Sequence, residues 1–90
     1  MDYITSKKGT IVEVDGELAT VKANVASEFK RMRLEKNLTQ QQVADAAGMN
    51  RVDVSRFESE RYNPTLDLIV RYASALGCDV RFELIPKKDV

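Results

Sequence analysis

The sequence contains no histidine and no tryptophan, and it has only one cysteine, two prolines and four glycines among 90 residues. The lack of histidine removes the commonest general base and a frequent zinc ligand. A single cysteine, Cys78, cannot form a disulfide within the chain, and it fits a reducing compartment. We therefore expect a protein that is not an enzyme and that holds no metal and no cofactor.

Long apolar runs and net charge are also missing. No run is long enough to span a membrane, residues 1–9 lack the apolar core of a signal peptide, and 14 basic residues balance 14 acidic ones. We expect one small cytoplasmic domain, for which dimerisation would be a natural supplement to a modest core. The charge is uneven, because residues 30–62 are mildly basic and residues 1–29 are mildly acidic.

The N-terminal extension, residues 1–23, allows two interpretations. Asp15-Gly16 between alternating residues is typical of a two-residue hairpin, whereas apolar residues from Leu18 to Met32 recur at helical spacing. We favour a strand at residues 10–14 and a helix that is established by about residue 24 and ends before Asn37.

Two short helices are expected next, within a helical domain at residues 24–77. Thr39 is a good N-cap and Gln42, three residues later, completes a capping box. Gly48 ends this helix in a tight turn, and Asn50 is the predicted N-cap of the following one. A fourth helix begins after Thr65 and ends at Gly77; its predicted inward stripe consists of Leu66, Ile69, Val70, Ala73 and Leu76.

The last segment, residues 78–90, is predicted to be a C-terminal β-strand and tail. Val80, Phe82 and Leu84 alternate with charged residues, and Pro86 stops the strand. A strand with unpaired amides requires a partner. We expect that partner to be the same strand of a second copy, in a homodimer held by Val80, Phe82 and Leu84; pairing with residues 10–14 is the alternative.

The segment "LTQQQVADAAGMNRVDVSRFESERYNPTLDLIVRYASALG" resembles the lambda-repressor-like, or XRE-type, helix-turn-helix family over residues 24–77. The resemblance implies a mainly α-helical bundle that binds double-stranded operator DNA as a transcriptional repressor. Glu60, where the family often has glycine, is a departure. The resemblance also implies an ion pair, Arg33 with Glu58, between the first helix and the end of the reading helix.

The predicted reading helix begins near Asn50, and its outward side chains suit base edges. Arg51 and Arg56 can each hold a guanine, Val52 can meet a thymine methyl, and Ser55 can bond a base or a phosphate. Thr39 and Gln40, at a helix N-terminus, are the expected phosphate contacts. The complete predicted DNA-binding set is Thr39, Gln40, Asn50, Arg51, Val52, Ser55, Arg56 and Arg61.

Asp53 is an acid among these residues, and two roles are open to it. It can stabilise the start of the helix through the helix dipole, or it can accept a hydrogen bond from cytosine N4. A small hydrolase that uses Asp53, Glu58 or Glu60 is a competing hypothesis. It is disfavoured because no histidine, metal cluster or pocket-forming loop supports these acids.

A helix-turn-helix core followed directly by "LGCDVRFELIPKK" resembles antitoxins of the HigA type and, more distantly, the HipB type. The resemblance implies an antitoxin that represses its own operon, and it also implies a partner, a RelE/HigB-like toxin. Because such a nuclease is expected to be basic, the acidic segment 1–29 is a suitable contact surface. The alternative is a stand-alone XRE-type transcriptional regulator without a toxin partner.

Overall fold

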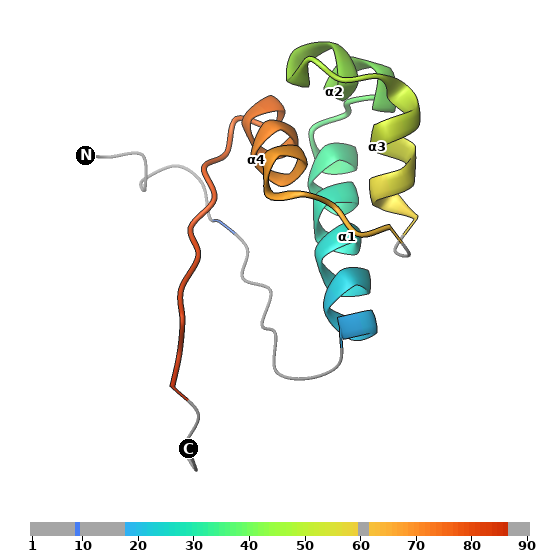
Figure 1. Ribbon diagram of the computed structural model, residues 1–90. Coiled ribbons are helices and arrows are strands. Elements are labelled where there is room, and N and C mark those ends of the chain that lie inside the picture. The colour runs from blue at the N-terminus through green and yellow to red at the C-terminus, as the bar shows by residue number, and fades with distance from the viewer. Residues whose placement is uncertain (1–8, 10–17, 60–61, 87–90) are drawn as a thin grey trace, which may run out of the picture.

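The structure, a computed structural model, describes residues 9, 18–59 and 62–86. These residues form α1 (Leu18–Glu35), α2 (Gln40–Ala47), α3 (Arg51–Glu58) and α4 (Leu66–Ala75). Figure 1 shows α2 at the carboxyl end of the long helix α1, with α3 on one side of α1 and α4 on the other. No helix in the described part of the chain is long and apolar enough to cross a membrane.

Helix α1 begins at Leu18, earlier than the predicted start near residue 24. The helical spacing of the apolar residues from Leu18 onward is therefore realised as a helix, and residues 15–16 lie outside the described residues. Strand 10–14 lies outside the described residues. The predicted stop is confirmed, because Asn37 adopts a left-handed backbone with φ 58°, which asparagine tolerates better than most residues.

Both predicted caps of the short helices are confirmed. Thr39 Oγ1 accepts from the Gln42 amide at 3.0 Å, and Gln42 Oε1 accepts from the Thr39 amide at 2.8 Å, which completes the capping box. Gly48 ends α2 with φ 71°. Asn50 Oδ1 accepts from the Asp53 amide at 3.0 Å. Each such cap contributes about 0.5–2 kcal/mol. Thr39 thus defines the start of α2, and Asn50 defines the start of α3.

An aromatic cluster joins three of the helices. Phe29 of α1, Phe57 of α3 and Tyr72 of α4 pack edge to face, with ring centroids 5.0–5.2 Å apart. Such pairs add about 0.5–1.5 kcal/mol beyond the burial of their area. The rest of the core extends this cluster towards α2 and the end of α4 with Val43, Ala44, Val54, Leu68 and Leu76.

The predicted inward stripe of α4 is wrong in part. Leu66 is 64% exposed and Val70 is 50% exposed, whereas Leu68 and Tyr72 are buried. Leu68, Tyr72 and Leu76 also recur at a spacing of four, so an apolar pattern alone allows both rotations of the helix. The rotation that forms places the Tyr72 hydroxyl beside a buried carboxylate.

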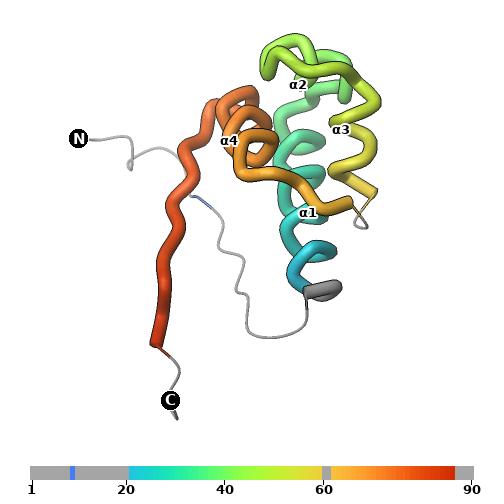
Figure 2. The backbone as a smooth tube through the Cα atoms, in the orientation of Figure 1, coloured from blue at the N-terminus to red at the C-terminus, as the bar shows by residue number. Residues whose placement is uncertain are grey.

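The C-terminal strand is not present in the described residues 78–86 of this chain, which have no regular secondary structure. Figures 1 and 2 show this segment leaving the end of α4 and running away from the helices. The alternating pattern by itself indicates only an extended backbone. A β-ladder, however, also needs a second strand within hydrogen-bonding distance, and the described part of one chain does not supply it.

Candidate nucleic-acid interface

Helix α3 is divided into an outward and an inward side. Val54, Phe57 and Glu58 are buried, while Arg51, Val52, Ser55 and Arg56 are exposed. Val52, a large apolar residue, is 50% exposed. An apolar surface between two arginines suits the edge of a base pair. All the outward residues are those predicted for base contact.

Gln40, at the first position of α2, lies between the outward side of α3 and the core. Its amide nitrogen donates to Glu58 Oε1 at 3.2 Å, and its amide oxygen accepts from Arg51 Nη1 at 3.3 Å. Because both ends of the amide are used, the orientation of the side chain is defined. Gln40 thus connects an exposed arginine of α3 to a buried carboxylate at the other end of the same helix.

The buried carboxylate belongs to Glu58, which forms the expected ion pair with Arg33. Arg33 Nε and Nη2 donate to Glu58 at 2.8 Å and 3.0 Å, and Arg33 Nη1 donates to the Leu38 carbonyl at 2.7 Å. The Tyr72 hydroxyl donates to Glu58 at 2.5 Å. Within the described residues, no buried side-chain nitrogen or oxygen lacks a hydrogen-bond partner. We call Arg33, Gln40, Glu58 and Tyr72 the Glu58 cluster.

The Glu58 cluster perturbs the titration of its own members. Burial acts to raise the pKa of Glu58, but hydrogen bonds from Arg33, Tyr72 and Gln40 outweigh burial and leave that pKa below its usual value. Burial and the hydrogen bond to Glu58 raise the pKa of the Tyr72 hydroxyl well above its usual value. At neutral pH the cluster therefore contains a carboxylate, a guanidinium and a neutral phenol. The cluster is a structural element that joins all four described helices.

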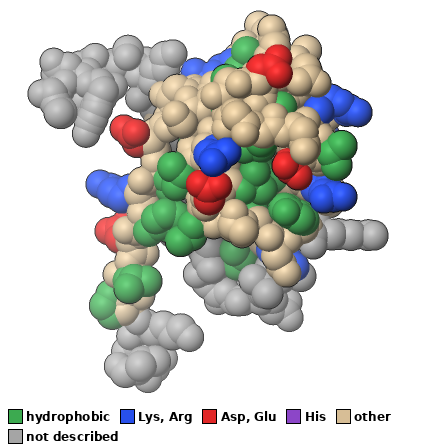
Figure 3. All heavy atoms as spheres, turned by 45° about the horizontal axis from the view of Figure 1, so that its top comes forward, with side chains coloured by type: hydrophobic (Ala, Val, Ile, Leu, Met, Phe, Trp, Pro, Cys, Tyr) green, Lys and Arg blue, Asp and Glu red, His purple; other side chains and the backbone are tan. Residues whose placement is uncertain are grey.

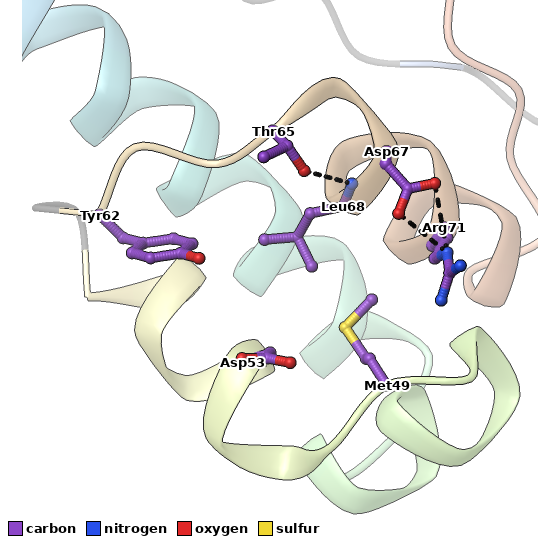
Figure 4. A pocket seen from close by; sticks show the side chains of 7 residues that line it. All are labelled: Met49, Asp53, Tyr62, Thr65, Asp67, Leu68 and Arg71. Carbon is purple, nitrogen blue, oxygen red and sulfur yellow. Dashed lines mark hydrogen bonds and ion pairs between the residues drawn. The ribbon is translucent and has the colours of Figure 1, made fainter.

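Asp53 lies away from the outward residues of α3. It is half-buried and lines a hollow of about 180 Å³ between the start of α3 and the start of α4, together with Met49 and Leu68. Figure 4 shows these side chains around the hollow, with Asp67 and Arg71 of α4 at its edge. Asp53 occupies the first turn of α3, where a carboxylate interacts favourably with the helix dipole. This position favours the structural role over hydrogen bonding to cytosine.

The surface around the helix pair carries both signs of charge. Figure 3 shows basic and acidic side chains interspersed on the face drawn, without one extended basic area. Attraction to phosphate would therefore be local and concentrated at Arg51, Arg56 and the N-terminus of α2. Of the other predicted contacts, Thr39 and Asn50 use their side-chain oxygens as helix caps, and Arg61 lies outside the described residues.

Several structural contacts were not predicted from the sequence. Among them are the Tyr72 hydroxyl on Glu58, the Leu38 carbonyl on Arg33, and a hydrogen bond from Arg71 to the Gly48 carbonyl. A tyrosine at a core position was the available signal for the first, since a buried hydroxyl needs a partner. Within the described residues, no group of three or more potential metal ligands lies together.

Two short helices joined by a glycine-containing turn, the second with a polar outward face, define a helix-turn-helix protein. A sequence model of the helix-turn-helix family matches residues 29–82, more than half of the chain. The chain therefore belongs to the XRE-type helix-turn-helix family. The match includes all of α2, α3 and α4 and the carboxyl-terminal part of α1.

Two relatives are similar over this region. The immunity repressor protein of Bacillus phage phi105 is 39% identical over 56 residues, which are 62% of this chain and 39% of the phage protein. The uncharacterized HTH-type transcriptional regulator y4dJ of Sinorhizobium fredii is 38% identical over 65 residues, which are 72% of this chain and 83% of that protein. The chain thus spans well under half of the first relative and most of the second.

Proposed function

We propose that this protein is a sequence-specific DNA-binding transcriptional repressor that reads its operator with α3. The observation that carries the proposal is the outward face of α3, where two arginines flank an exposed valine and a serine. The N-terminal half of such a helix enters the major groove. Arg51 and Arg56 would each hold guanine O6 and N7, and each contact gives about 1–3 kcal/mol of discrimination.

The N-terminus of α2 is the proposed phosphate contact. Free amide groups and the helix dipole favour an anion at that position. Gln40 is held there between Arg51 and Glu58, so its side chain is oriented before DNA arrives. Thr39 and Asn50 would contribute through the hydrogen-bonding groups of their side chains that the caps leave over, and Arg61 would add a phosphate contact from the following loop.

The proposal is tested in two steps. The preferred sequence is first selected from a pool of random duplexes, and gel shifts then measure the affinity of Arg51→Ala and Arg56→Ala for that operator. Each variant should lose about 5- to 150-fold of operator affinity, which corresponds to one base contact of about 1–3 kcal/mol. Arg31→Ala is the matched control, because Arg31 is an exposed arginine of α1 that pairs with Glu28 and Glu35. Equal operator affinity of the wild type and both α3 variants would contradict this assignment of the reading helix.

The protein is proposed to act as a homodimer through residues 78–86. Phe82 is 65% exposed and Leu84 is 98% exposed in the single chain, and such side chains gain from burial. Two antiparallel copies of the segment would pair their backbones and bring Val80, Phe82 and Leu84 together across a two-fold axis. Two such domains would contact half-sites about 34 Å apart.

A Phe82→Glu variant tests the dimer, because it places two like charges in the proposed two-fold contact. Light scattering should report a dimer for the wild type and a monomer for the variant. Arg81→Glu, a charge change on the alternate face of the same segment, is the matched control and should stay dimeric. A wild type that is monomeric at micromolar concentration would end this part of the proposal.

The finer role that we propose is antitoxin of a type II toxin–antitoxin operon, with a RelE/HigB-like toxin as partner. Its support is the acidic balance of residues 1–29, which would suit a basic toxin. The alternative, a stand-alone XRE-type regulator, is supported by the names of the two relatives. Co-expression with the product of the adjacent gene separates the two, since a stable complex and rescue of growth are expected only for an antitoxin.

A further inference from the structure

Arg71 of α4 makes two contacts in different directions. Its Nε pairs with Asp67 Oδ2 at 3.1 Å, and its Nη1 donates to the Gly48 carbonyl at 3.1 Å. The first contact lies within α4. The second reaches the turn between α2 and α3, because Gly48 is the residue that ends α2. The fixed planar geometry of a guanidinium allows it to make both contacts at once.

The two ends of α3 are held by different means. At the carboxyl end, the buried Glu58 is bonded to α1, α2 and α4 through Arg33, Gln40 and Tyr72. At the amino end, the hollow of about 180 Å³ separates the start of α3 from α4. Close packing is therefore incomplete on that side of the turn. The hydrogen bond from Arg71 to the Gly48 carbonyl connects α4 to the turn beside this hollow.

The start of α3 is also the part that carries Arg51 and Val52. Only the chain from Met49 to Asn50 separates these two residues from the Gly48 carbonyl that Arg71 binds. A shift of the turn would therefore displace the predicted base contacts directly. Direct readout depends on hydrogen bonds with narrow limits of distance and angle.

We infer that Arg71 is a positioning residue for DNA recognition: its hydrogen bond to the Gly48 carbonyl sets the place of the α2–α3 turn and thereby aligns the start of α3 with the bases. Arg71 does this without touching DNA itself. The inference rests on the proposed function and adds to it a specificity determinant on α4. Because the Arg71 side chain is half-exposed, its ion pair and its hydrogen bond both contribute little to stability, so a substitution of Arg71 should affect recognition more than folding.

Arg71→Lys and Arg71→Gln test the inference on the intact chain. The first keeps the charge and loses the planar fork, and the second loses both. Affinity is measured for the selected operator and for a scrambled duplex of equal length, over a range of salt concentrations, beside the melting temperature. Both variants should bind the operator at least about five-fold more weakly, the lower end of one base contact. Binding of the scrambled duplex, the salt dependence and the melting temperature should not change.

Arg31→Gln is the matched control. The Arg31 side chain is 49% exposed, against 48% for Arg71, and it also pairs with a carboxylate four residues away. Its side chain donates to Glu28 and Glu35 of α1 itself, so this variant should keep the full ratio of operator affinity to scrambled-duplex affinity.

Three results would overturn the inference. One is a ratio of operator affinity to scrambled-duplex affinity that is the same in both Arg71 variants as in the wild type. Another is evidence of a direct phosphate contact. In that case the slope of the logarithm of the binding constant against the logarithm of the salt concentration would decrease in magnitude by about 0.9 in Arg71→Gln and would be unchanged in Arg71→Lys. The third is a lower melting temperature with equal losses on both duplexes, which indicates a merely structural role. If the wild type selects no preferred sequence, the proposed function itself fails, and that result is separate from these three.

Discussion

Replacing Glu58 with glutamine tests whether the Glu58 cluster, in addition to the apolar core, holds α3 in place. Glutamine has nearly the same shape as glutamate, so the packing is kept while the charge is removed. Glu58 accepts hydrogen bonds from Arg33 Nε and Nη2, from Gln40 and from Tyr72. A glutamine cannot accept all of them, and its own NH₂ group would face the Arg33 guanidinium.

The size of the effect follows from the burial of Arg33, whose side chain is 8% exposed. Removing one partner of a buried ion pair typically costs about 3–5 kcal/mol, a large part of the roughly 5–15 kcal/mol that stabilises a natural domain. For a chain of this size, 1 kcal/mol corresponds to about 4–8 °C. The melting temperature of Glu58→Gln should therefore fall by at least about 12 °C.

Urea denaturation followed by circular dichroism measures this change in the free energy of unfolding. Glu35→Gln is the control, because Glu35 forms an ion pair with Arg31 that is exposed on α1, and it should change little. A Glu58→Gln variant that is destabilised by less than about 1 kcal/mol would refute the reasoning, because the charge would then not be needed by its buried partner.

The pH dependence gives a second test of the same cluster. The pKa of Glu58 is lower in the folded protein than its usual value of 4.5, so the unfolded chain binds more protons in acid. The stabilisation from Glu58 is therefore complete above pH 4.5 and decreases as the pH falls through the lower, folded pKa. Denaturation measured between pH 7 and pH 3 should show this component in the wild type and not in Glu58→Gln.

Other substitutions test single contacts by the same denaturation measurements. Tyr72→Phe should cost about 1.5–3 kcal/mol, since it removes a hydrogen bond to a charged acceptor. Because the pKa of Tyr72 is raised in the folded protein, the folded state keeps the phenol proton that the unfolded chain releases, so the wild type should lose stability above about pH 10. Tyr72→Phe should abolish this loss, and a wild type that is equally stable at pH 8 and pH 11 would contradict the reasoning. Gly48→Ala should lower the free energy of unfolding by about 1–2 kcal/mol, because Gly48 has a left-handed backbone with φ 71°. An unchanged free energy of unfolding would contradict this turn geometry. Asn50→Ala should cost about 0.5–2 kcal/mol through the lost cap, whereas Asn50→Ser should restore most of it.

The central part of the fold could be predicted from the sequence because its signals are local. The capping box of Thr39 and Gln42 and the cap of Asn50 depend on residues within one turn. Such contacts form whenever the adjacent helix forms, so a pattern of a few residues is sufficient. The exposure of Arg51 and Val52 followed from the same short stretch, because the inward positions Val54 and Phe57 define the opposite side of α3.

The parts that were not predicted depend on residues far apart in the chain. The rotation of α4 that forms buries Tyr72, whose hydroxyl reaches Glu58 on another helix. Leu66 and Val70 have the same helical spacing as the residues that are buried, and only the tertiary contact distinguishes the two sides. The C-terminal segment is a similar case, since its alternating pattern specifies an extended backbone and does not specify a second strand.

The exposed side of α3 has a consequence for how the proposed DNA target could change during evolution. Val52, Ser55 and Arg56 are exposed and none of them belongs to the core or to the Glu58 cluster, so mutation can redirect them to new sequences with little loss of folding stability. Arg51 is different, because its partner Gln40 is bonded to Glu58 in turn. During evolution, three positions of the proposed reading surface are therefore expected to diverge singly, and the fourth is expected to change together with residue 40.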